Sequence, residues 1–528
     1  MGMYLNPGNS GFKRILKDYY VDKTGMIEII NNRINSMGNL ICISRPRRFG
    51  KSYAARMLCA YYDCTCKSGE MFKNFKVSSS DDYNEHLNQY NVIYLDIAGI
   101  ISKMNTNGIP IKNVASRIKE LINQEIQLSF PDIPHYDDAS DAILACVADE
   151  NKKFIFIIDE WDAVIREAKN DKETQKSYLE LLREWFKNGN FTDEAVAAAY
   201  MTGILPIKKD GSESAVSDFD EYSVLDPGEF APYTGFTEDE VKALCENYSM
   251  DFQKAKEWYD GYSFGECHSI YNPYSVMQAM KRKSFKSYWR KTSKAEALTT
   301  YVNMNFDDLQ EKILRLIAGE PIQVYTEDFE NDFQTFNSSD DVLTLMIHLG
   351  YLVFDEETSQ ARIPNEELKN VFRRLIQRPT NVKLSELIER SNKLFMDTLS
   401  GNETAVANAI ELIRQTNYAP QYYNNEQSLR YAIKFAYITL VDRYMQIEEL
   451  PSGKGLADIV YIPVNGSNDP ALVVELKWNE TTEAAISQIK NKHYPSVLQS
   501  YHGKIVLVGI NYDSDTGEHS CKIEKIIK

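Results

Sequence analysis

Residues 41–52, ICISRPRRFGKS, form the stretch that decides the fold of the N-terminal part of the chain. A short apolar segment runs into Gly50, Lys51 and Ser52, and a helical pattern follows. Backbone amides at the start of that helix would point at bound phosphates, Lys51 would reach the β and γ oxygens, and the Ser52 hydroxyl would bind Mg²⁺. Arg45 stands where the general pattern has its first glycine. The other residues expected to contact the nucleotide are Arg47, Arg48, Phe49 and Tyr53.

A second segment completes the signature in the right chain order. Residues 152–160, KKFIFIIDE, are a continuous apolar run that ends in two carboxylates, as expected of a strand buried on both faces. Asp159 would complete the Mg²⁺ shell and Glu160 would polarise the attacking water. The alternative is that the first segment is only a basic turn that caps a helix, and that the second is only a core strand whose acids face solvent. This alternative requires two independent segments to imitate one site. Thr202, which closes the apolar run 195–201, either senses the γ-phosphate or only forms a turn.

Composition limits the class of protein. At 528 residues the chain is long enough for about three domains. The net charge of −17 argues against nonspecific coating of nucleic acid, so any such contact is expected at a local site. No leader pattern and no membrane-spanning run is found. Among eight cysteines only Cys64 and Cys66 lie close together, in a spacing that is neither a zinc nor a redox pair, and reduced thiols in a cytoplasm are expected.

Short apolar runs alternate with helical patterns up to about residue 245, which predicts an α/β domain with a mostly parallel sheet. The expected strands are 39–44, 92–95, 154–158 and 195–202, and the polar stretch 208–220 is expected to be a loop. Helical patterns dominate from residue 237, with turns expected at 259–265 and 272–275. The aromatic residues of these turns could stack on a base, but packing where loops cross a core is the favoured interpretation.

Residues 341–377 carry the pattern of a winged helix: a helix over 343–349, strands over 351–354 and 361–363, and a helix from Glu366. Its acidic surroundings favour a lid on the nucleotide domain over a DNA-binding role. We therefore expect three domains, a nucleotide domain over 1–245, a helical and winged-helix-like region over 246–378, and a third domain over 379–528.

A second set of charged residues lies near the C-terminus. Strands are expected over 455–463 and 471–477, joined by a turn at 465–470, and their antiparallel pairing would bring Asp458 close to Glu475. Glu475 and Lys477 share one strand face, and Leu476 points to the core. Two carboxylates form a hard oxygen site for Mg²⁺, and an adjacent ammonium can activate water, which is the chemistry of phosphodiester hydrolysis. A surface hairpin with salt bridges is the alternative, but the apolar strand 472–474 favours a buried site.

Two further residues are weaker candidates for this site. Glu426, in the helical pattern 425–432, is either a third metal-binding carboxylate or a solvated helix acid. Gln488, in the helical pattern 482–490, is placed to contact the end of the strand or a phosphate.

The segments RPRRFGKS, IFIIDEWD, GLADIVYIP, VVELKW and AISQIKNKHY, in this order over essentially the full length, resemble the bacterial AAA-ATPase-like proteins that carry a C-terminal PD-(D/E)XK nuclease-superfamily domain. Arg45 in the phosphate loop is usual in that family, and Ala457 stands where the superfamily name has proline. The resemblance implies a P-loop NTPase domain followed by a restriction-endonuclease-like α/β domain. It implies ATP binding through Gly50, Lys51 and Ser52, an acidic pair at Asp159 and Glu160, and nuclease positions at Asp458, Glu475 and Lys477.

Two functions from different classes compete. The first is an ATP-hydrolysing enzyme that positions a Mg²⁺-dependent nuclease acting on nucleic acid, with DNA favoured over RNA. The second is a nucleotide-driven switch whose C-terminal domain only binds DNA or a protein partner. The acidic charge favours the switch, whereas the set Asp458, Glu475 and Lys477 favours the nuclease, since a binding domain has no need of a metal site. Helicase action is a distant third because no further motor motifs are found, and self-association is left open.

Overall fold

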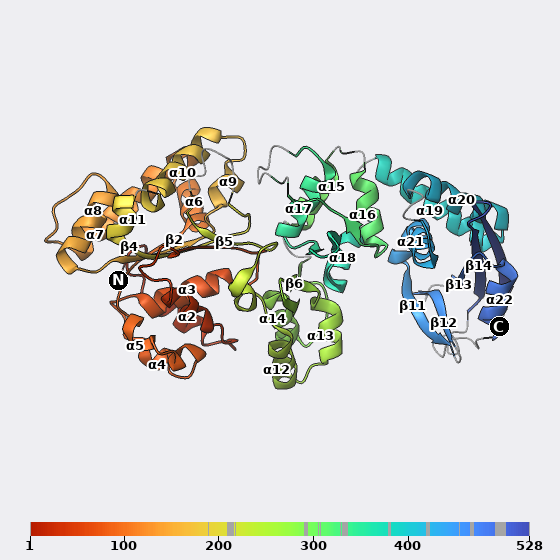
Figure 1. Cartoon of the computed structure of the whole chain (residues 1–528), viewed down its shortest axis with the longest axis horizontal. Helices are drawn as coiled ribbons and strands as arrows, with labels where there is room; N and C mark the ends of the chain where they lie inside the picture. The colour runs from red at the N-terminus through yellow and green to blue at the C-terminus, as the bar shows by residue number, and fades with distance from the viewer. Residues whose placement is uncertain are drawn as a thin grey trace. The chain divides into compact units, whose positions relative to one another are not determined.

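The computed structural model divides the chain into two compact units, residues 1–286 with 324–365 and residues 287–323 with 366–528 (Figure 1). The domain boundaries expected at residues 245 and 378 stay predictions, and the loop expected at 208–220 lies largely outside the described residues. The structure describes residues 2–187, 189–207, 216, 218–289, 294–304, 306, 308–327, 329, 336–377, 382–418, 423–452, 455–464, 469–491 and 503–526.

The first unit is built on a five-stranded sheet in the order β2-β3-β4-β1-β5, in which every neighbouring pair runs parallel. The four strands expected from the apolar runs are confirmed, and a short polar strand that the sequence did not indicate pairs with β1. The strands are β1 (Leu40–Ser44), β2 (Asn91–Asp96), β3 (Phe154–Asp159), β4 (Val196–Gly203) and β5 (Asp220–Tyr222).

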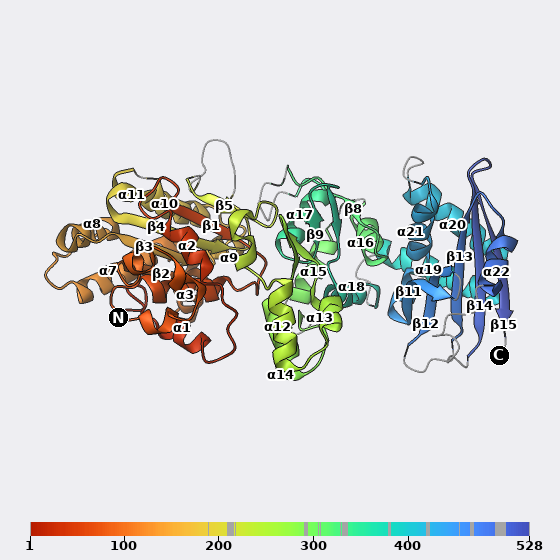
Figure 2. The ribbon, with the colours of Figure 1, turned by 60° about the horizontal axis from the view of Figure 1, so that its bottom comes forward.

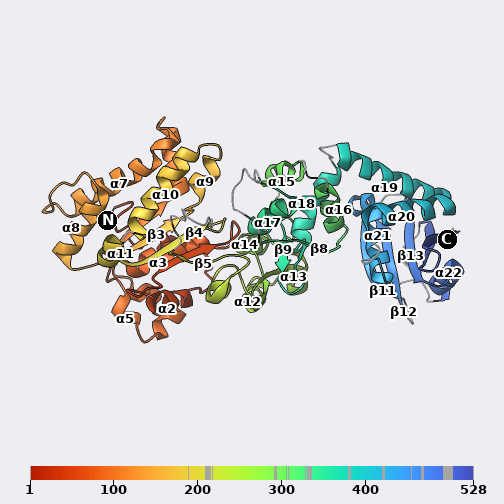
Figure 3. The same cartoon turned by 45° about the horizontal axis from the view of Figure 1, so that its top comes forward.

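Helices cover both faces of this sheet, which explains why β1, β3 and β4 are apolar at nearly every position (Figures 1 and 3). One face carries α1 (Ser10–Ile15), α2 (Gly25–Asn31), α3 (Lys51–Tyr62), α4 (Gly69–Phe72), η1 (Lys76–Ser79) and α5 (Tyr83–His86). The other face carries α6 (Ile97–Thr106), η2 (Ile111–Asn113), α7 (Val114–Ser129), α8 (Ala139–Glu150), α9 (Ala163–Glu167), α10 (Lys172–Phe186) and α11 (Gly189–Ala195).

Because the strands are parallel, their carboxyl ends meet at one edge. Ser44 at the end of β1 lies beside Gly203, and Asp96 at the end of β2 lies beside Asp159. Residues that follow these strands are therefore brought together at this edge, which is where open α/β sheets bind ligands.

The remainder of the first unit is helical with two small hairpins. It contains η3 (Gly228–Tyr233), α12 (Glu238–Tyr248), α13 (Phe252–Tyr259), β6 (Tyr262–Phe264), β7 (Cys267–Ile270), α14 (Pro273–Arg282), α17 (Ser339–His348), β9 (Val353–Asp355) and β10 (Gln360–Arg362). The helix and two strands expected from 343 to 363 are confirmed. The turn expected over 259–265 was wrong in part, since it holds strand β6, which pairs with β7 and buries alternate side chains Tyr262 and Phe264.

The second unit has a five-stranded sheet in the order β11-β12-β13-β14-β15 (Figure 2). All neighbouring pairs are antiparallel except β13 and β14, which run parallel and are joined through α22 (Thr482–Asn491). The strands are β11 (Tyr444–Ser452), β12 (Gly455–Pro463), β13 (Ala471–Trp478), β14 (Ile505–Asp513) and β15 (Glu518–Ile526). The two strands expected from the sequence are confirmed, and residues 465–468 of the expected turn lie outside the described residues.

Both faces of this sheet are also covered. Val474 and Leu476 pack in a core with α20 and α21, while Val473 packs on the opposite face against Ile486 and Ile489 of α22. Burial on both sides is the reason for the continuous apolar run of β13. The other elements are α15 (Lys294–Val302), α16 (Leu309–Ile317), β8 (Ile322–Gln323), α18 (Glu366–Gln377), α19 (Val382–Ser400), α20 (Glu403–Asn417), α21 (Glu426–Ala436) and η6 (Ile438–Asp442). The chain thus has a parallel α/β domain, a helical middle and a C-terminal α/β domain.

No helix within the described ranges combines the length and the apolar character needed to cross a bilayer.

Candidate active sites

The loop between β1 and α3 has the backbone of a phosphate-binding turn. Gly50 precedes the first helical residue with a φ of 91°, a left-handed conformation that glycine adopts without a steric cost. Arg48 also has a positive φ, 73°, which is uncommon for a residue with a side chain. The amides of Lys51 and Ser52 begin α3 and have no preceding helical turn to bond to, whereas the Tyr53 amide already donates to the Gly50 carbonyl at 2.9 Å. Of the flanking residues, Arg47 is half-buried, whereas Tyr53 is exposed on α3.

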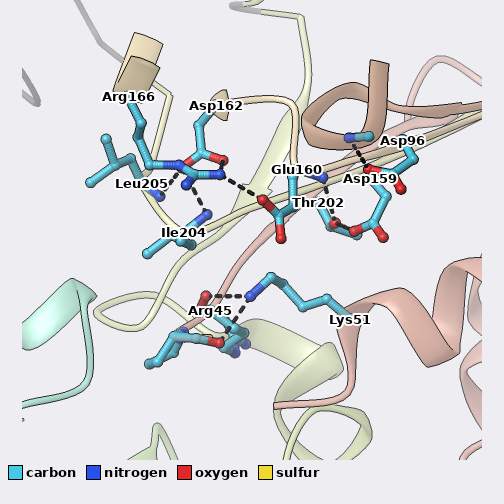
Figure 4. Close-up of polar contacts among 12 residues, drawn as sticks. Arg45, Lys51, Asp96, Asp159, Glu160, Asp162, Arg166, Thr202, Ile204 and Leu205 are labelled. Atoms are coloured by element: carbon cyan, nitrogen blue, oxygen red, sulfur yellow. Dashed lines mark hydrogen bonds and ion pairs between the residues drawn. The ribbon is translucent and has the colours of Figure 1, made fainter. Parts of the chain in front are cut away.

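Lys51 is buried, and its ammonium lies over the loop that precedes it. The Nζ atom donates to the carbonyl oxygens of Arg45, at 2.8 Å, and Pro46, at 2.9 Å (Figure 4). Burial lowers the pKa of Lys51 to about 8, although the negative charges of Asp159, Asp162 and Glu160 oppose this shift. The predicted phosphate ligand thus lies close to the predicted acids.

Arg45, the residue in place of the first glycine, is a structural anchor that the sequence did not assign. Its guanidinium is fully buried. Nη1 donates to the carbonyls of Ser44, Tyr222 and Ser223, at 3.0, 2.7 and 2.6 Å. Nε donates to Thr234 Oγ1 at 3.0 Å and Nη2 to the Pro227 carbonyl at 3.2 Å. Burial lowers the pKa of Arg45 to about 10, because neutral carbonyls compensate a buried charge less well than a carboxylate does. The guanidinium ties the loop to β5 and to the segment that follows.

Replacing Arg45 by lysine is expected to destabilise the first unit by about 2–4 kcal/mol, because an ammonium cannot reach five separated acceptors and leaves buried carbonyls unpaired. Differential scanning fluorimetry should find the melting temperature of the first transition lower by roughly 5–10 °C. Arg117→Lys, at a surface ion pair on α7, is the matched control and should change it little. Equal melting temperatures for both variants would show that Arg45 is no anchor.

Phe49 explains the aromatic cluster at 259–265. Its buried ring packs against Tyr262 and Phe264 of strand β6, with centroids 5.1 and 5.7 Å apart, and its carbonyl accepts from the Gly235 amide at 3.0 Å. The Arg48 guanidinium lies 4.2 Å from the centroid of Tyr274. The cluster therefore holds the phosphate loop in place, in line with the favoured packing interpretation.

Asp159 and Thr202 come together across neighbouring strands. The Thr202 hydroxyl donates to Asp159 Oδ1 at 2.6 Å, and both side chains are buried. Burial raises the pKa of the Asp159 carboxyl, while hydrogen bonds from Ser52 and Thr202 and the charge of Lys51 oppose the shift. Ser52 and Thr202, both predicted to belong to the nucleotide site, thus both bond to the Asp159 carboxylate.

Glu160 is held by a residue that the sequence reasoning missed. Arg166, one turn into the following helix, forms an ion pair with Glu160 Oε2 at 2.8 Å and with Asp162 Oδ2 at 3.1 Å (Figure 4). Burial would raise the pKa of Glu160, but the charge and hydrogen bond of Arg166 outweigh it, so the pKa is lowered and the carboxylate stays ionised. Glu160 has a φ of 54°, a strained conformation of the kind found at functional sites. Asp162 and Arg166 are four residues apart, a spacing at which side chains on a helix meet, and this spacing was the sequence signal that could have revealed their ion pair.

In the second unit, the strand register brings Asp458 and Glu475 side by side. Ile459 pairs with Val474, so the next two residues outward, Asp458 and Glu475, face each other. Asp458 Oδ2 also accepts from the Leu476 amide at 2.7 Å. Both residues are buried, since only 8% of the surface of Asp458 and 1% of that of Glu475 is exposed. The sequence prediction of two buried acids at the end of this hairpin is realised in the fold.

Lys477 and Gln488 approach Glu475 from two sides. The Lys477 ammonium lies 3.8 Å from Glu475 Oε1, and the Gln488 side-chain amide of α22 donates to the same oxygen. Gln488 therefore contacts strand β13, at Glu475 and not at the strand end that was expected. The ammonium and the two carboxylates occupy the same face of the hairpin.

Glu426 and Arg430 complete this cluster from α21. Burial raises the pKa of Glu426, and the charge of Asp458 raises it further while Lys477 and Arg430 oppose the shift. Arg430 Nη2 donates to Asp458 Oδ1 at 3.1 Å. The sequence reasoning missed Arg430, although it lies one helical turn after Glu426 and so on the same helix face. Within the described ranges, no three acidic, histidine or cysteine side chains already form a metal-binding group.

Two family models match the chain. Residues 8–212 match a model described as a predicted AAA-ATPase, and residues 424–521 match the PD-(D/E)XK nuclease superfamily. A search of curated proteins finds no match. Among solved structures, the Aeropyrum pernix ORC2 protein in ADPNP–ADP complexes is 12% identical with a TM-score of 0.27, covering 67% of this chain and 93% of that chain. Cdc6p from Pyrobaculum aerophilum is 12% identical with a TM-score of 0.25, covering 67% and 92%.

Proposed function

We propose that this chain, which combines an AAA-ATPase-like domain with a PD-(D/E)XK nuclease-superfamily domain, hydrolyses ATP in its first unit and cleaves nucleic acid, DNA in preference to RNA, in its second. The observation that carries the proposal is that each unit gathers two carboxylates and a lysine beside adjacent strands, with Asp159, Asp458 and Glu475 buried. Such groups are costly to bury and are found where chemistry needs them.

In the first unit, the amides after Gly50 and the ammonium of Lys51 would bind the ATP phosphates. Lys51 would then exchange the carbonyls of Arg45 and Pro46 for phosphate oxygens. Glu160, kept ionised by Arg166, would accept a hydrogen bond from the attacking water and orient it. Thr202 would fix Asp159 and sense the nearby γ-phosphate.

Replacing Glu160 by glutamine should leave ATP binding intact and slow hydrolysis, because the amide keeps the shape but loses the charged acceptor. We expect turnover to fall by about a hundredfold or more. Phosphate release measured at saturating ATP checks this, with Glu167→Gln, an exposed acid of α9, as the matched control. Near-normal turnover in Glu160→Gln would mean that Glu160 is structural and that another group orients the water.

The donors present in both units suit Mg²⁺, which prefers carboxylate and hydroxyl oxygens. Ser52 and Asp159 would hold one ion in the first unit, and Asp458, Glu475 and Glu426 another in the second. When bound, the ion supplies a Lewis acid that offsets the charge on phosphate oxygens. In the second unit, the Lys477 ammonium would orient or activate the water, and Gln488 would keep Glu475 in place.

The runner-up is a nucleotide-driven switch that only binds DNA or a protein through its second unit. The observation that favours it is the ion pair between Arg430 and Asp458, since a metal would have to share that carboxylate with a guanidinium. The net charge of −17 also favours the switch over the nuclease. Measuring ATP turnover with and without DNA, together with cleavage of that DNA, separates the two functions: the switch changes turnover without cleavage.

We infer that the protein works in the cytoplasm, since its eight cysteines are free thiols. Self-association is compatible with the proposal and could supply a cation to the ATP phosphates from a second copy.

A further inference from the structure

A cavity of about 540 Å³ lies in the first unit, apart from the phosphate loop. Its walls are the end of strand β2, helix α3, the beginning of helix α6 and the N-terminal segment 2–7. The side chains that give it its chemistry are Tyr4, Arg56, Tyr94, Asp96 and Lys103. The volume is in the range of sites for small organic ligands.

The N-terminal wall of this cavity is fixed in place. The Glu125 carboxylate of α7 accepts from the amides of Met3, Tyr4 and Leu5 at 2.8, 2.8 and 2.7 Å. The Tyr94 amide donates to the Tyr4 carbonyl at 2.8 Å, so the segment lies along β2. A pocket held by such bonds is preformed, which reduces the entropy lost when a ligand binds.

Two of the lining groups lack a partner of their own. Tyr94 is 7% exposed, and its hydroxyl has no hydrogen-bond partner among the described residues. Burial raises the pKa of this phenol, so the group stays protonated and able to donate. The Arg56 guanidinium lies 5.7 Å from the Tyr94 ring centroid and forms no ion pair within the described part of the chain. The Tyr94 hydroxyl oxygen has less than 1 Å² of accessible surface, so it does not face the cavity, and the anion-binding group of this wall is the unpaired Arg56 guanidinium.

The charged side chains that line the cavity limit the class of ligand that it can bind. Arg56 and Lys103 contribute two cations, and Asp96 contributes one carboxylate, whose Oδ1 already accepts from the Gly99 amide at 2.9 Å. Two cations in the wall suit a ligand with a doubly charged phosphate better than a ligand with a single carboxylate. The other oxygen of Asp96 can accept from a hydroxyl, as a sugar or polyol would offer.

We propose that this cavity binds a small phosphorylated polyol, with its phosphate on Arg56 and Lys103 and a hydroxyl group on Asp96. The site is separate from that of ATP, because none of its lining residues belongs to the phosphate loop. It is nevertheless adjacent, since Asp96 lies next to Asp159 in the strand register.

Isothermal titration of the full-length chain with ribose 5-phosphate tests this, using two preparations in which the phosphate loop cannot capture the probe: the parent with excess ADP and Mg²⁺, and Lys51→Ala without nucleotide. Both should bind it. Arg56→Gln should weaken binding about tenfold or more, and Lys103→Gln about fivefold, because both remove a charged contact and Lys103 is the more exposed of the two. Arg14→Gln, an exposed cation of α1, should bind like the parent.

The comparison ligands decide which part of the probe matters. Ribose and inorganic phosphate should each bind more weakly than ribose 5-phosphate. Binding of ribose as tight as that of the phosphate ester, or equal binding of inorganic phosphate, would overturn the proposed class. The absence of binding in both preparations, or binding unchanged in folded Arg56→Gln and Lys103→Gln, would overturn the site itself. Because the Lys51→Ala arm needs no nucleotide, failure of ATP binding would be a separate result.

Discussion

Lys51→Ala is expected to abolish ATP binding at millimolar ATP, the largest effect that we predict for the first unit. The buried ammonium would contact two phosphates, and charge-assisted bonds of this kind justify a loss of about a hundredfold or more. ATP with Mg²⁺ should raise the melting temperature of the parent by ligand linkage, and this shift should vanish in the variant. The amides of α3 remain, but they cannot replace the cation.

The matched control is Lys73→Ala, an exposed lysine of the same unit that forms a surface ion pair with Glu70. It should keep the full ATP-dependent shift. An undiminished shift in Lys51→Ala would remove Lys51 from the nucleotide site.

Asp458→Asn should abolish metal-dependent cleavage and leave ATP binding intact, with the rate falling by about a hundredfold or more. The asparagine side chain can still accept from the Leu476 amide, so the hairpin should survive while the negative charge is lost. Manganese binding by the full-length chain should weaken in this variant. Lys477→Ala should also lose cleavage but should keep manganese binding, because an ammonium is no metal ligand.

Asp515→Asn, in the turn between β14 and β15, is the control for a lost surface carboxylate. It should cleave and bind manganese like the parent. Loss of ATP binding in Asp458→Asn would instead indicate that the substitution disturbs the fold beyond its own site.

Both sites could be predicted because their main residues stand at the ends of apolar runs. A strand buried on both faces is apolar throughout, so the first acids after it, Asp159 and Glu160, are marked by the sequence itself. The same reasoning located Glu475 directly after the apolar run 471–474 of β13. In each case the strand and the functional residue are neighbours in the chain, and no tertiary information is needed.

The partners of these acids could not be assigned in the same way. Arg166 and Arg430 reach Glu160 and Asp458 from helices, and their position depends on how those helices pack on the sheet. Arg45 was assigned only as an unusual residue of the phosphate loop. Four of its five acceptors follow more than 170 residues later in the chain, and long-range contacts of this kind leave no local pattern.

The cleavage of linear and plasmid DNA by the purified full-length chain, with Mg²⁺ and with or without ATP, tests the central claim most directly. The account predicts cleavage that requires the metal, increases with ATP in the parent but not in Lys51→Ala, and is lost in Asp458→Asn. If the parent cleaves neither DNA nor RNA under any nucleotide and metal condition, and titrated Mn²⁺ does not bind, the nuclease function is contradicted and the binding switch takes its place.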